Sequence, residues 1–323
     1  MINSIEINNF KSVKSVRLAD CRRINVMIGC PNVGKSNILE ALSLFDVPFL
    51  VESRDKYLDR LVRIQRIYDL FHNGDSSVEI SVEAGENGYR ISRQANNGLL
   101  LELVKGEQRV NYTFSPSLGL STRKDYGISP DIHVYFFSRP LRFDNSNKEF
   151  LLPPFGNNLM EIVAQLPALK KHIASLFHRY GLKMVFDSGS QEIRAIRENG
   201  MNMFLIPFNA LADSLQRLIF YKAAIMSNKD KLICFEEPEA HTFPPYITSV
   251  VDDIISDTSN QYFITTHSPY VMNSLLEKCG DELAVFVLDM DEGATNVKRL
   301  SDSELEEVYD NGVDMFFNIE AFK

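Results

Sequence analysis

The sequence predicts an α/β fold with a buried sheet, and two observations predict that sheet. The first is a short apolar run at residues 24–28 that ends at Gly29 and is followed by apolar residues at helical spacing over residues 36–45. The second is a pair of short apolar runs at residues 231–235 and 261–265, with a helical stretch between them. Strands that alternate with helices in this way indicate a sheet covered by helices.

Residues 78–114 predict a separate antiparallel β-meander. Their β-type runs alternate with glycine-rich or Asn-Gly turns, which are strong hairpin signals because such residues adopt the left-handed backbone of tight turns. The runs are at residues 78–84, 89–93, 99–104 and 109–114, and the turns are at residues 85–88, 96–98 and 105–108. A further strand is expected at residues 131–137.

The following stretch is expected to be mainly helical. Apolar residues at helical spacing predict a helix over residues 157–180, which Pro167 is expected to split because proline lacks the N–H of a helical hydrogen bond. Residues 210–226 predict a second helix. Short strands are expected at residues 183–186, 192–196 and 203–206, and others near the chain ends at residues 2–8 and 283–288.

The charge of the chain weighs against a protein whose whole surface binds nucleic acid. The 323 residues carry a net charge of −9, and the pI is about 5.3. Such proteins need extended positive surface, so a nucleic-acid partner is possible but not indicated. The basic residues near the N-terminus could form a local patch, but we expect them to lie in solvent along the edge of a strand. They are Lys11, Lys14, Arg17, Arg22 and Arg23.

Cysteine usage and hydropathy predict a cytoplasmic protein without membrane contact. Cys21, Cys30, Cys234 and Cys279 form neither a CxxC pair nor a Cys/His cluster at zinc spacing. The first residues lack the basic and apolar regions of a signal peptide. No apolar run approaches the roughly 18 residues required to cross a membrane.

Residues 29–36 read Gly-Cys-Pro-Asn-Val-Gly-Lys-Ser and match the phosphate-binding pattern G-x-x-x-x-G-K-[ST] in full. Glycines let successive N–H groups point at phosphate, and the helix that begins here favours an anion at its N-terminus. Lys35 is expected to reach the β- and γ-phosphates, and Ser36 to ligate Mg²⁺. The motif therefore predicts a P-loop NTPase. The residues expected around the nucleotide are Gly29, Cys30, Pro31, Asn32, Val33, Gly34, Lys35, Ser36 and Asn37.

ATP is favoured over GTP by what the rest of the sequence lacks. Small GTPases of the Era type resemble this chain in the sequence of residues 31–36. They also require an Asp-x-x-Gly motif that contacts the γ-phosphate and an Asn-Lys-x-Asp motif that binds guanine. No glycine of this chain has aspartate three positions before it. The nearest guanine motif, at residues 228–231, places its aspartate one position early.

A carboxylate pair and a histidine follow two of the predicted strands. Glu236 and Glu237 come directly after the apolar residues 232–235, and strand ends in an α/β sheet open onto the ligand crevice. Glu236 is expected to hold Mg²⁺ through water, and Glu237 to orient or deprotonate the attacking water. His267 ends the next strand and is expected to sense the γ-phosphate. The predicted catalytic residues are thus Glu237, His267 and Lys35.

The order of these motifs resembles that of the ABC-type ATPases, in the branch that contains RecF-like, structural-maintenance-of-chromosomes-like (SMC-like) and overcoming-lysogenization-defect (OLD) proteins. The shared features are a Walker A loop at residues 29–36, a Glu-Glu pair with its extension at residues 236–241, the switch histidine His267 and an opening strand at residues 5–12. The resemblance covers nearly the whole chain. It implies an ATPase head whose cofactors are ATP and Mg²⁺.

Heads of this family form dimers that sandwich two nucleotides, so the resemblance implies a homodimer. A signature segment of one head contacts the γ-phosphate held by the other, and residues 211–217 correspond to it. Ala212 stands at the usual serine position, the usual glycine is missing, and Ser214 can substitute with a shifted register. The departure is expected to affect the hydrolysis rate more than nucleotide binding. The expected signature contacts are Ala212, Asp213 and Ser214.

Other positions depart from the family pattern as well. Glu236 stands where aspartate is usual and would ligate Mg²⁺ from one methylene further out. Gln65 and Gln94 are the candidates for the Q-loop glutamine. The chain has no stretch long enough for a coiled-coil arm, and it ends soon after Asp289 and Asp291, which we expect to form a solvated strand end. A stand-alone head without a Toprim nuclease domain is therefore expected.

The resemblance implies one ATPase head over residues 1–323. Within it we expect a Walker A lobe at residues 1–45, a helical linker with the antiparallel β subdomain at residues 46–138, a helical signature subdomain at residues 139–228, and a Walker B and switch-histidine lobe at residues 229–323.

The implied function is an Mg-ATP-dependent ATPase that dimerises around nucleotide and regulates a separate effector protein, in phage (antiviral) defence or DNA maintenance. Two alternatives stay open. The altered signature motivates a nucleotide-sensing scaffold with little turnover. A RecF-like DNA-binding clamp is the other, and its binding would weaken steeply with added salt.

Overall fold

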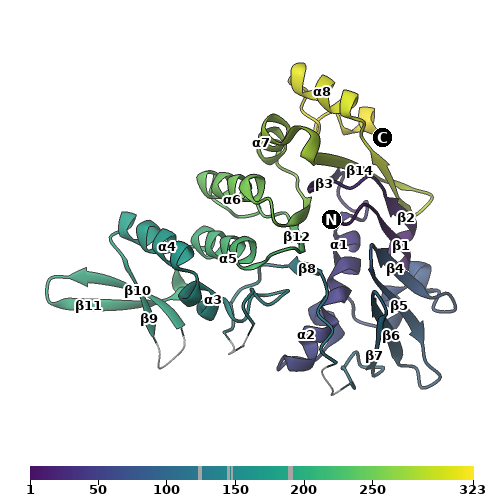
Figure 1. The fold of residues 1–323 in the computed structure, drawn as a ribbon, viewed down its shortest axis with the longest axis horizontal. Helices are drawn as coiled ribbons and strands as arrows, with labels where there is room; N and C mark the ends of the chain where they lie inside the picture. The colour runs from purple at the N-terminus through teal and green to yellow at the C-terminus, as the bar shows by residue number, and fades with distance from the viewer. Residues whose placement is uncertain (123–125, 144–145, 147, 188–191) are drawn as a thin grey trace. The chain divides into compact units, whose positions relative to one another are not determined.

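The computed structural model describes residues 1–122, 126–143, 146, 148–187 and 192–323 (Figure 1). These residues divide into two compact units. The first unit comprises Met1–Val134, Asp230–Glu237 and Thr258–Lys323, and the second comprises Tyr135–Lys229 and Pro238–Asp257. The predicted phosphate loop, both carboxylates of the Glu-Glu pair and His267 all belong to the first unit.

A largely parallel sheet forms one layer of the first unit, and it confirms the predicted α/β fold. Its strands lie in the order β15-β14-β3-β13-β12-β8. Strand β3 pairs in parallel with β13 and β14, and β13 pairs in parallel with β12. Every residue of β3 and β13 is buried, as expected for parallel strands covered on both faces. The strands are β3 (Ile24–Gly29), β8 (Ile132–Tyr135), β12 (Leu232–Glu236), β13 (Gln261–Thr265), β14 (Leu283–Asp291) and β15 (Ala294–Arg299).

An antiparallel sheet forms the other layer of the first unit, in the order β2-β1-β4-β5-β6-β7. It contains the predicted meander and joins it to the opening strand, because Ile5 of β1 pairs with Ala84 of β4. The sequence did not predict this pairing. The strands are β1 (Ile5–Phe10), β2 (Val13–Leu18), β4 (Ile80–Ala84), β5 (Asn87–Arg93), β6 (Leu99–Lys105) and β7 (Gln108–Phe114).

Helix α1 (Lys35–Ser43) packs between these two sheets (Figure 1). It contacts β1 of the antiparallel sheet and β3 and β12 of the parallel sheet. The hydroxyl of Tyr89, on β5, donates a hydrogen bond of 2.7 Å to the carbonyl of Ala41. The Tyr89 ring also meets Phe45 edge-on with centroids 5.1 Å apart, a contact that contributes about 1 kcal/mol beyond its buried area. These contacts fix the helix that follows the phosphate loop.

The remaining helices of the first unit are α2 (Val47–Glu52), α7 (Pro269–Cys279) and α8 (Asp302–Asp310). The second unit contains the helices α3 (Leu159–Gln165), α4 (Pro167–Arg179), α5 (Asp213–Ser227) and α6 (Pro244–Ser256), and an antiparallel sheet of β9 (Lys183–Asp187), β10 (Glu192–Asn199) and β11 (Asn202–Pro207). Pro167 begins α4, so the predicted split is confirmed. Within the described part of the chain, no helix is both long and apolar enough to span a membrane.

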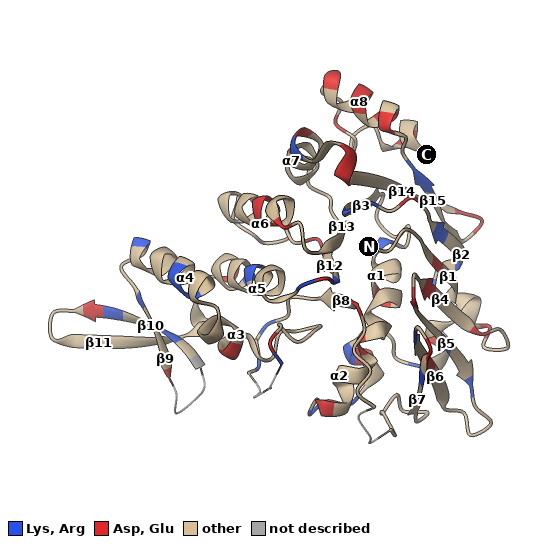
Figure 2. Cartoon of the chain, viewed as in Figure 1, with Lys and Arg blue, Asp and Glu red and all other residues tan. Residues whose placement is uncertain are grey.

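The basic residues near the N-terminus do not all form a solvated strand edge. Lys14 and Arg17 are exposed on the edge strand β2, as predicted. Figure 2 marks the basic positions of the chain in blue. The prediction is wrong for Lys11 and Arg23, which are largely buried and form ion pairs with Glu40 and Glu282. Both cations lie against carboxylates that are distant in sequence, and that pairing offsets the cost of taking each charge out of water.

Asp46 is a fully buried carboxyl beside α1. Its Oδ2 accepts a hydrogen bond of 3.0 Å from the backbone N–H of Val134, and no described residue hydrogen-bonds its Oδ1. Burial raises the pKa of Asp46 well above its ordinary value, against the smaller opposing effect of the Val134 hydrogen bond. The folded chain therefore keeps this proton at pH values where the unfolded chain has released it.

We expect Asp46→Asn to remove part of the pH dependence of stability. Because the pKa of Asp46 is higher in the folded chain, this group stabilises the fold fully at pH values below its unfolded pKa of about 3.9. Its contribution to the unfolding free energy falls as the pH rises above that value, by at most about 1.4 kcal/mol per pH unit. Urea unfolding of wild type and variant from pH 4 to 7 measures the difference. Stability of the variant relative to wild type should rise with pH. Parallel pH profiles would show that Asp46 is ionised in the folded chain.

Candidate nucleotide site

The phosphate loop leaves the end of β3 at Gly29 and enters α1 after Gly34. Gly29 has a φ of 153° and Gly34 a φ of 100°, and Asn32 between them has a φ of 65°. A Cβ on Gly34 would lie 2.1 Å from the hydroxyl oxygen of Thr295, so glycine is required here for conformation and for space. No side chain of the described residues caps α1, and its first N–H groups are therefore available to an anion.

Lys35 folds back over this loop. Its Nζ donates hydrogen bonds of 2.8 Å to the Gly29 carbonyl and 2.7 Å to the Cys30 carbonyl. Burial lowers the pKa of Lys35, and the nearby charge of Glu237 partly opposes the shift. The ammonium group is thus held at the loop by weak carbonyl acceptors, which a phosphate could replace with stronger charge-assisted hydrogen bonds.

The other predicted loop residues differ in exposure. Pro31 and Asn32 are exposed, Cys30 and Ser36 are half-buried, and Val33 is buried. Val33 is therefore the buried apolar side chain of the loop. The neighbouring Asn37 lies one residue further along α1, and its amide donates a hydrogen bond of 2.7 Å to the Ser12 hydroxyl.

The Glu-Glu pair follows β12 at the edge where β13 also ends. Glu236 pairs with Thr265 across the parallel strands. The backbone N–H of Glu237 donates to the Thr265 carbonyl at 3.0 Å and to the Thr265 hydroxyl at 3.1 Å. Glu237 has a φ of 40°, in the left-handed region, which costs a non-glycine residue about 1–3 kcal/mol. Thr265 holds Glu237 in this unfavourable conformation, a kind of strain that clusters at functional sites.

His267 lies beside Glu237. Its Nε2 is 3.5 Å from the Glu237 Oε1. Burial lowers the pKa of His267, the charge of Lys35 lowers it further, and the charge of Glu237 opposes both effects. Since the ordinary value is about 6.5, the imidazole is mainly neutral at pH 7 and carries one N–H donor. Lys35, Glu237 and His267, which the sequence predicted as catalytic, therefore interact with one another in the structure.

The donor groups present fit a magnesium ion. Glu236 offers carboxylate oxygens at the strand end, and Ser36 offers a hydroxyl in the first turn of α1. Mg²⁺ prefers such oxygen ligands and normally adds water and substrate phosphates to complete its shell. The carboxylate of Glu236 already attracts a cation, because Nη2 of Arg63 lies 2.6 Å from its Oε1. A bound Mg²⁺ would neutralise phosphate charge as the terminal phosphate leaves.

The predicted signature residues lie in the second unit, at the start of α5. Asp213 pairs with Arg217 at 2.9 Å. The Ser214 hydroxyl donates to the His241 carbonyl at 3.0 Å and accepts from the Phe243 N–H at 3.2 Å. Ala212 is exposed at the helix N-cap, and no described side chain caps the first turn of α5.

Sequence reasoning missed Thr265 and Arg63. Thr265 stands in the Thr-Thr-His stretch at the end of β13, so its strand-end position was an available signal. Arg63 had no signal, because it lies in an irregular segment without a motif. Of the two Q-loop candidates, Gln65 is exposed close to Arg63, and Gln94 begins the hairpin turn between β5 and β6.

A glycine loop at the end of a buried parallel strand, an uncapped helix behind it and carboxylates at a neighbouring strand end define the chain as a P-loop NTPase. The sequence matches over residues 24–273 the family described as "AAA domain, putative AbiEii toxin, Type IV TA system". The chain belongs to this family, and it is an ATPase of the P-loop class.

Two relatives are similar to this chain in sequence. A Helicobacter pylori protein named ATP/GTP phosphatase is 22% identical over 321 residues, covering 83% of this chain and 85% of that protein. An uncharacterized Methanocaldococcus jannaschii protein is 32% identical over 96 residues, which are 26% of this chain and 41% of that protein.

Solved structures show the same fold. The Pyrococcus furiosus Smc head domain with an extended coiled coil, bound to the C-terminal domain of ScpA, matches with a TM-score of 0.51 at 14% identity, over 96% of this chain and 98% of that chain. A SmcHead bound to the C-winged helix domain of ScpA matches with a TM-score of 0.50 at 16% identity, over 94% of this chain and 99% of that chain. The fold is therefore similar to that of the Smc head domains, as the motif order implied.

Proposed function

We propose that this ATPase binds Mg-ATP at residues 29–37, hydrolyses it with Glu237, and uses the nucleotide to associate with a second copy of itself and control a partner protein. The observation that carries the proposal is the placement of Glu237. Thr265 holds it in a left-handed conformation, 3.5 Å from His267 and within electrostatic reach of Lys35.

In the proposed reaction each of the charged or polar residues has a separate role. Lys35 would bind the β- and γ-phosphates, and Ser36 and Glu236 would hold Mg²⁺. Glu237 orients the attacking water and accepts its proton. The neutral imidazole of His267 donates its N–H to the γ-phosphate. The lowered pKa of His267 leaves the ring mainly neutral near pH 7, with one N–H to donate.

The uncapped N-terminus of α5 supports dimerisation around nucleotide. The signature residues of one copy, Ala212, Asp213 and Ser214, would contact the γ-phosphate bound to the other copy. Helix N-termini attract phosphate through their free N–H groups and their partial positive charge. ATP would then favour the dimer, and hydrolysis would release it.

Similarity to other proteins supports a separate partner. The related Smc head structures each contain a bound domain of ScpA, and the family description names a putative toxin of a Type IV TA system. We propose a cytoplasmic switch whose ATP-bound dimer engages an effector protein in antiviral defence. Its net charge of −9 argues against a DNA clamp as the main role.

A nucleotide-sensing scaffold with little turnover is the second candidate. The bonding of Ser214 favours it, since that hydroxyl already donates to His241 and accepts from Phe243 and would have to change partners to reach a phosphate. Ala212 has no hydroxyl to replace it. Both proposals share ATP binding and differ in the rate of hydrolysis.

We expect Lys35→Ala to weaken ATP binding about 10- to 100-fold, because it removes a charge-assisted contact to phosphate. Fluorescence titration of the purified chain with an ATP analogue measures this, and phosphate release measures turnover. Lys298→Ala, which removes a half-buried lysine that pairs with Glu304, is the matched control.

Wild type that turns over ATP, and that elutes at twice its mass only with ATP and Mg²⁺, supports the dimerising ATPase. Tight ATP binding without measurable phosphate release supports the scaffold. Equal ATP affinity of wild type and Lys35→Ala would show that the phosphate loop does not bind the nucleotide.

A further inference from the structure

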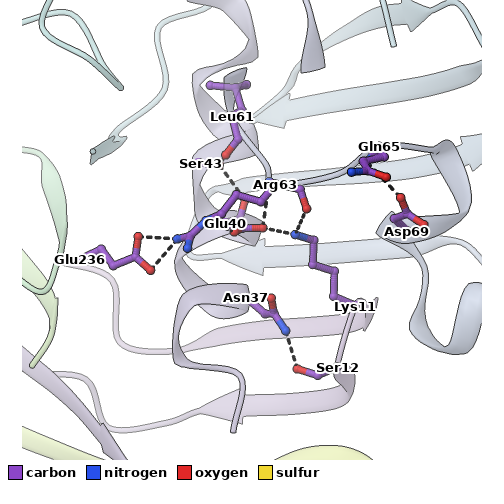
Figure 3. Close-up of polar contacts among 10 residues, drawn as sticks. All are labelled: Lys11, Ser12, Asn37, Glu40, Ser43, Leu61, Arg63, Gln65, Asp69 and Glu236. Carbon is purple, nitrogen blue, oxygen red and sulfur yellow. Dashed lines mark hydrogen bonds and ion pairs between the residues drawn. The ribbon is translucent and has the colours of Figure 1, made fainter. Parts of the chain in front are cut away.

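A buried carboxylate on the nucleotide-loop helix organises a chain of charges. Glu40, on α1, is only 3% exposed. Lys11, in the turn after β1, forms an ion pair with its Oε2, and Arg63 Nε lies 2.8 Å from its Oε1 (Figure 3). The Lys11 ammonium also donates to the Arg63 carbonyl at 2.9 Å. Both the backbone and the side chain of Arg63 are therefore tied to this buried anchor.

The far end of the same guanidinium reaches the metal carboxylate. Nη2 of Arg63 lies 2.6 Å from Oε1 and 2.5 Å from Oε2 of Glu236. The side chain of Glu236 is 18% exposed, and that of Arg63 is 63% exposed. Arg63 thus connects a buried structural carboxylate to the carboxylate at the nucleotide site, and the contact with Glu236 lies at the accessible end of the network.

The contact with Glu236 is not needed to neutralise the buried charge. Glu40 keeps Lys11 as its partner if Arg63 is removed. The Arg63 side chain is exposed, so its guanidinium can leave Glu236 for solvent when another cation neutralises that carboxylate. The contact between Arg63 and Glu236 is therefore better suited to exchanging one cation for another than to stabilising the fold.

Metal binding and the Arg63 contact compete for the same atoms. Mg²⁺ requires its ligand oxygens at about 2.0–2.1 Å in a regular octahedron, or hydrogen bonds from its bound waters to those oxygens. Arg63 Nη2 lies within hydrogen-bond distance of both Glu236 oxygens. A metal that engages Glu236 must displace this guanidinium, at least from one oxygen.

We propose that Arg63 is a placeholder cation, which neutralises Glu236 in the nucleotide-free protein and is displaced from it when a divalent metal enters with the nucleotide. This inference rests on the proposed function, because it takes Glu236 as the metal carboxylate. Arg63 lowers the metal affinity of the empty site, so that the metal binds with nucleotide rather than before it. Displaced from Glu236, Arg63 stays attached to Glu40 through Nε and through its backbone.

The test is Mn²⁺ binding to the nucleotide-free protein, followed by the electron paramagnetic resonance signal of free Mn²⁺. Arg63→Ala should bind Mn²⁺ about 3- to 10-fold more tightly than wild type, because an ion pair that competed with the metal is gone. Arg63→Lys should give a smaller gain. The matched control is Arg66→Ala, three positions along, where an exposed arginine pairs with Asp69 at 3.2 Å and should leave Mn²⁺ affinity unchanged.

A double-mutant comparison decides whether the effect passes through Glu236. In a Glu236→Gln background, which weakens Mn²⁺ binding by itself, Arg63→Ala should have no further effect. If Arg63→Ala leaves Mn²⁺ affinity unchanged or weakens it in the wild-type background, the placeholder role is wrong. A gain that persists in the Glu236→Gln background would also overturn it, since the metal would then bind elsewhere.

Where Mn²⁺ alone binds too weakly to measure in every protein, ADP supplies the readout. The Mg²⁺ concentration that half-restores ADP binding after chelation should be lower for Arg63→Ala than for wild type, and an equal value contradicts the proposal. Arg63→Ala should also not weaken ADP binding in the absence of metal. Neither measurement depends on hydrolysis, so a chain that binds ADP without ATP turnover would refute the proposed hydrolysis and leave this inference intact.

Discussion

Glu237→Gln should abolish most ATP hydrolysis while leaving ATP binding intact. Replacing the carboxylate by an amide removes the proton acceptor and keeps the side-chain shape, and loss of a general base lowers turnover by about 10²- to 10⁴-fold. The left-handed backbone and the two hydrogen bonds from the Glu237 N–H to Thr265 do not involve the carboxylate, so the variant should fold as wild type does. Phosphate release under saturating Mg-ATP measures the loss.

The control for this variant is another strand-end carboxylate of the same sheet. Asp289, on β14, pairs with Lys323 at 3.0 Å, and Asp289→Asn should leave turnover within about twofold of wild type. We also expect Glu237→Gln to remain as an ATP-bound dimer, because binding continues without hydrolysis. Turnover of Glu237→Gln equal to that of wild type would remove Glu237 from the reaction, and the scaffold proposal would then depend on whether that turnover is above background.

The phosphate loop and the Glu-Glu pair could be predicted from sequence because their chemistry is local. Residues 29–36 carry the whole motif in one stretch, and the apolar run of β12 points directly to Glu236 and Glu237. The buried strands β3, β12 and β13 were predicted for the same reason. A short run of apolar residues between polar ones is typical of a strand buried in the interior of a folded chain.

The contacts around Arg63 could not be predicted, because they join residues that are far apart in sequence. Arg63 and Glu236 are separated by 173 positions, and Lys11 and Glu40 by 29. An arginine or lysine in an irregular segment does not indicate which carboxylate it will pair with. For that reason the sequence favoured a solvent-exposed Lys11, although its side chain is only 12% exposed beside Glu40.

Sheet membership also depends on distant partners. The meander at residues 78–114 was predicted correctly from its turns, but its union with β1 follows from the pairing of Ile5 with Ala84, across most of the first hundred residues. Local turn chemistry fixes neighbouring strands, whereas the choice of a distant edge depends on which apolar faces remain to be covered.

Gly34→Ala should eliminate nucleotide binding and destabilise the first unit. At a φ of 100° any side chain is strained, and the new Cβ would lie 2.1 Å from the Thr295 hydroxyl and 2.7 Å from that of Ser12. Those hydroxyls hydrogen-bond each other at 2.7 Å and must separate, or the loop must shift. We expect ATP affinity to fall at least about 100-fold and the unfolding free energy to fall by about 1–3 kcal/mol.

A second glycine serves as the control that distinguishes the cost of backbone strain from the loss of nucleotide binding. Gly293, in the turn between β14 and β15, has a φ of 79°, and nothing lies within 4 Å of a Cβ built on it. Gly293→Ala therefore carries backbone strain of about 1–2 kcal/mol without the collision, and it should bind ATP as wild type does. If Gly34→Ala loses only as much stability as Gly293→Ala and keeps its ATP affinity, the loop can adapt to a side chain, and the close approach to Thr295 does not determine how the nucleotide binds.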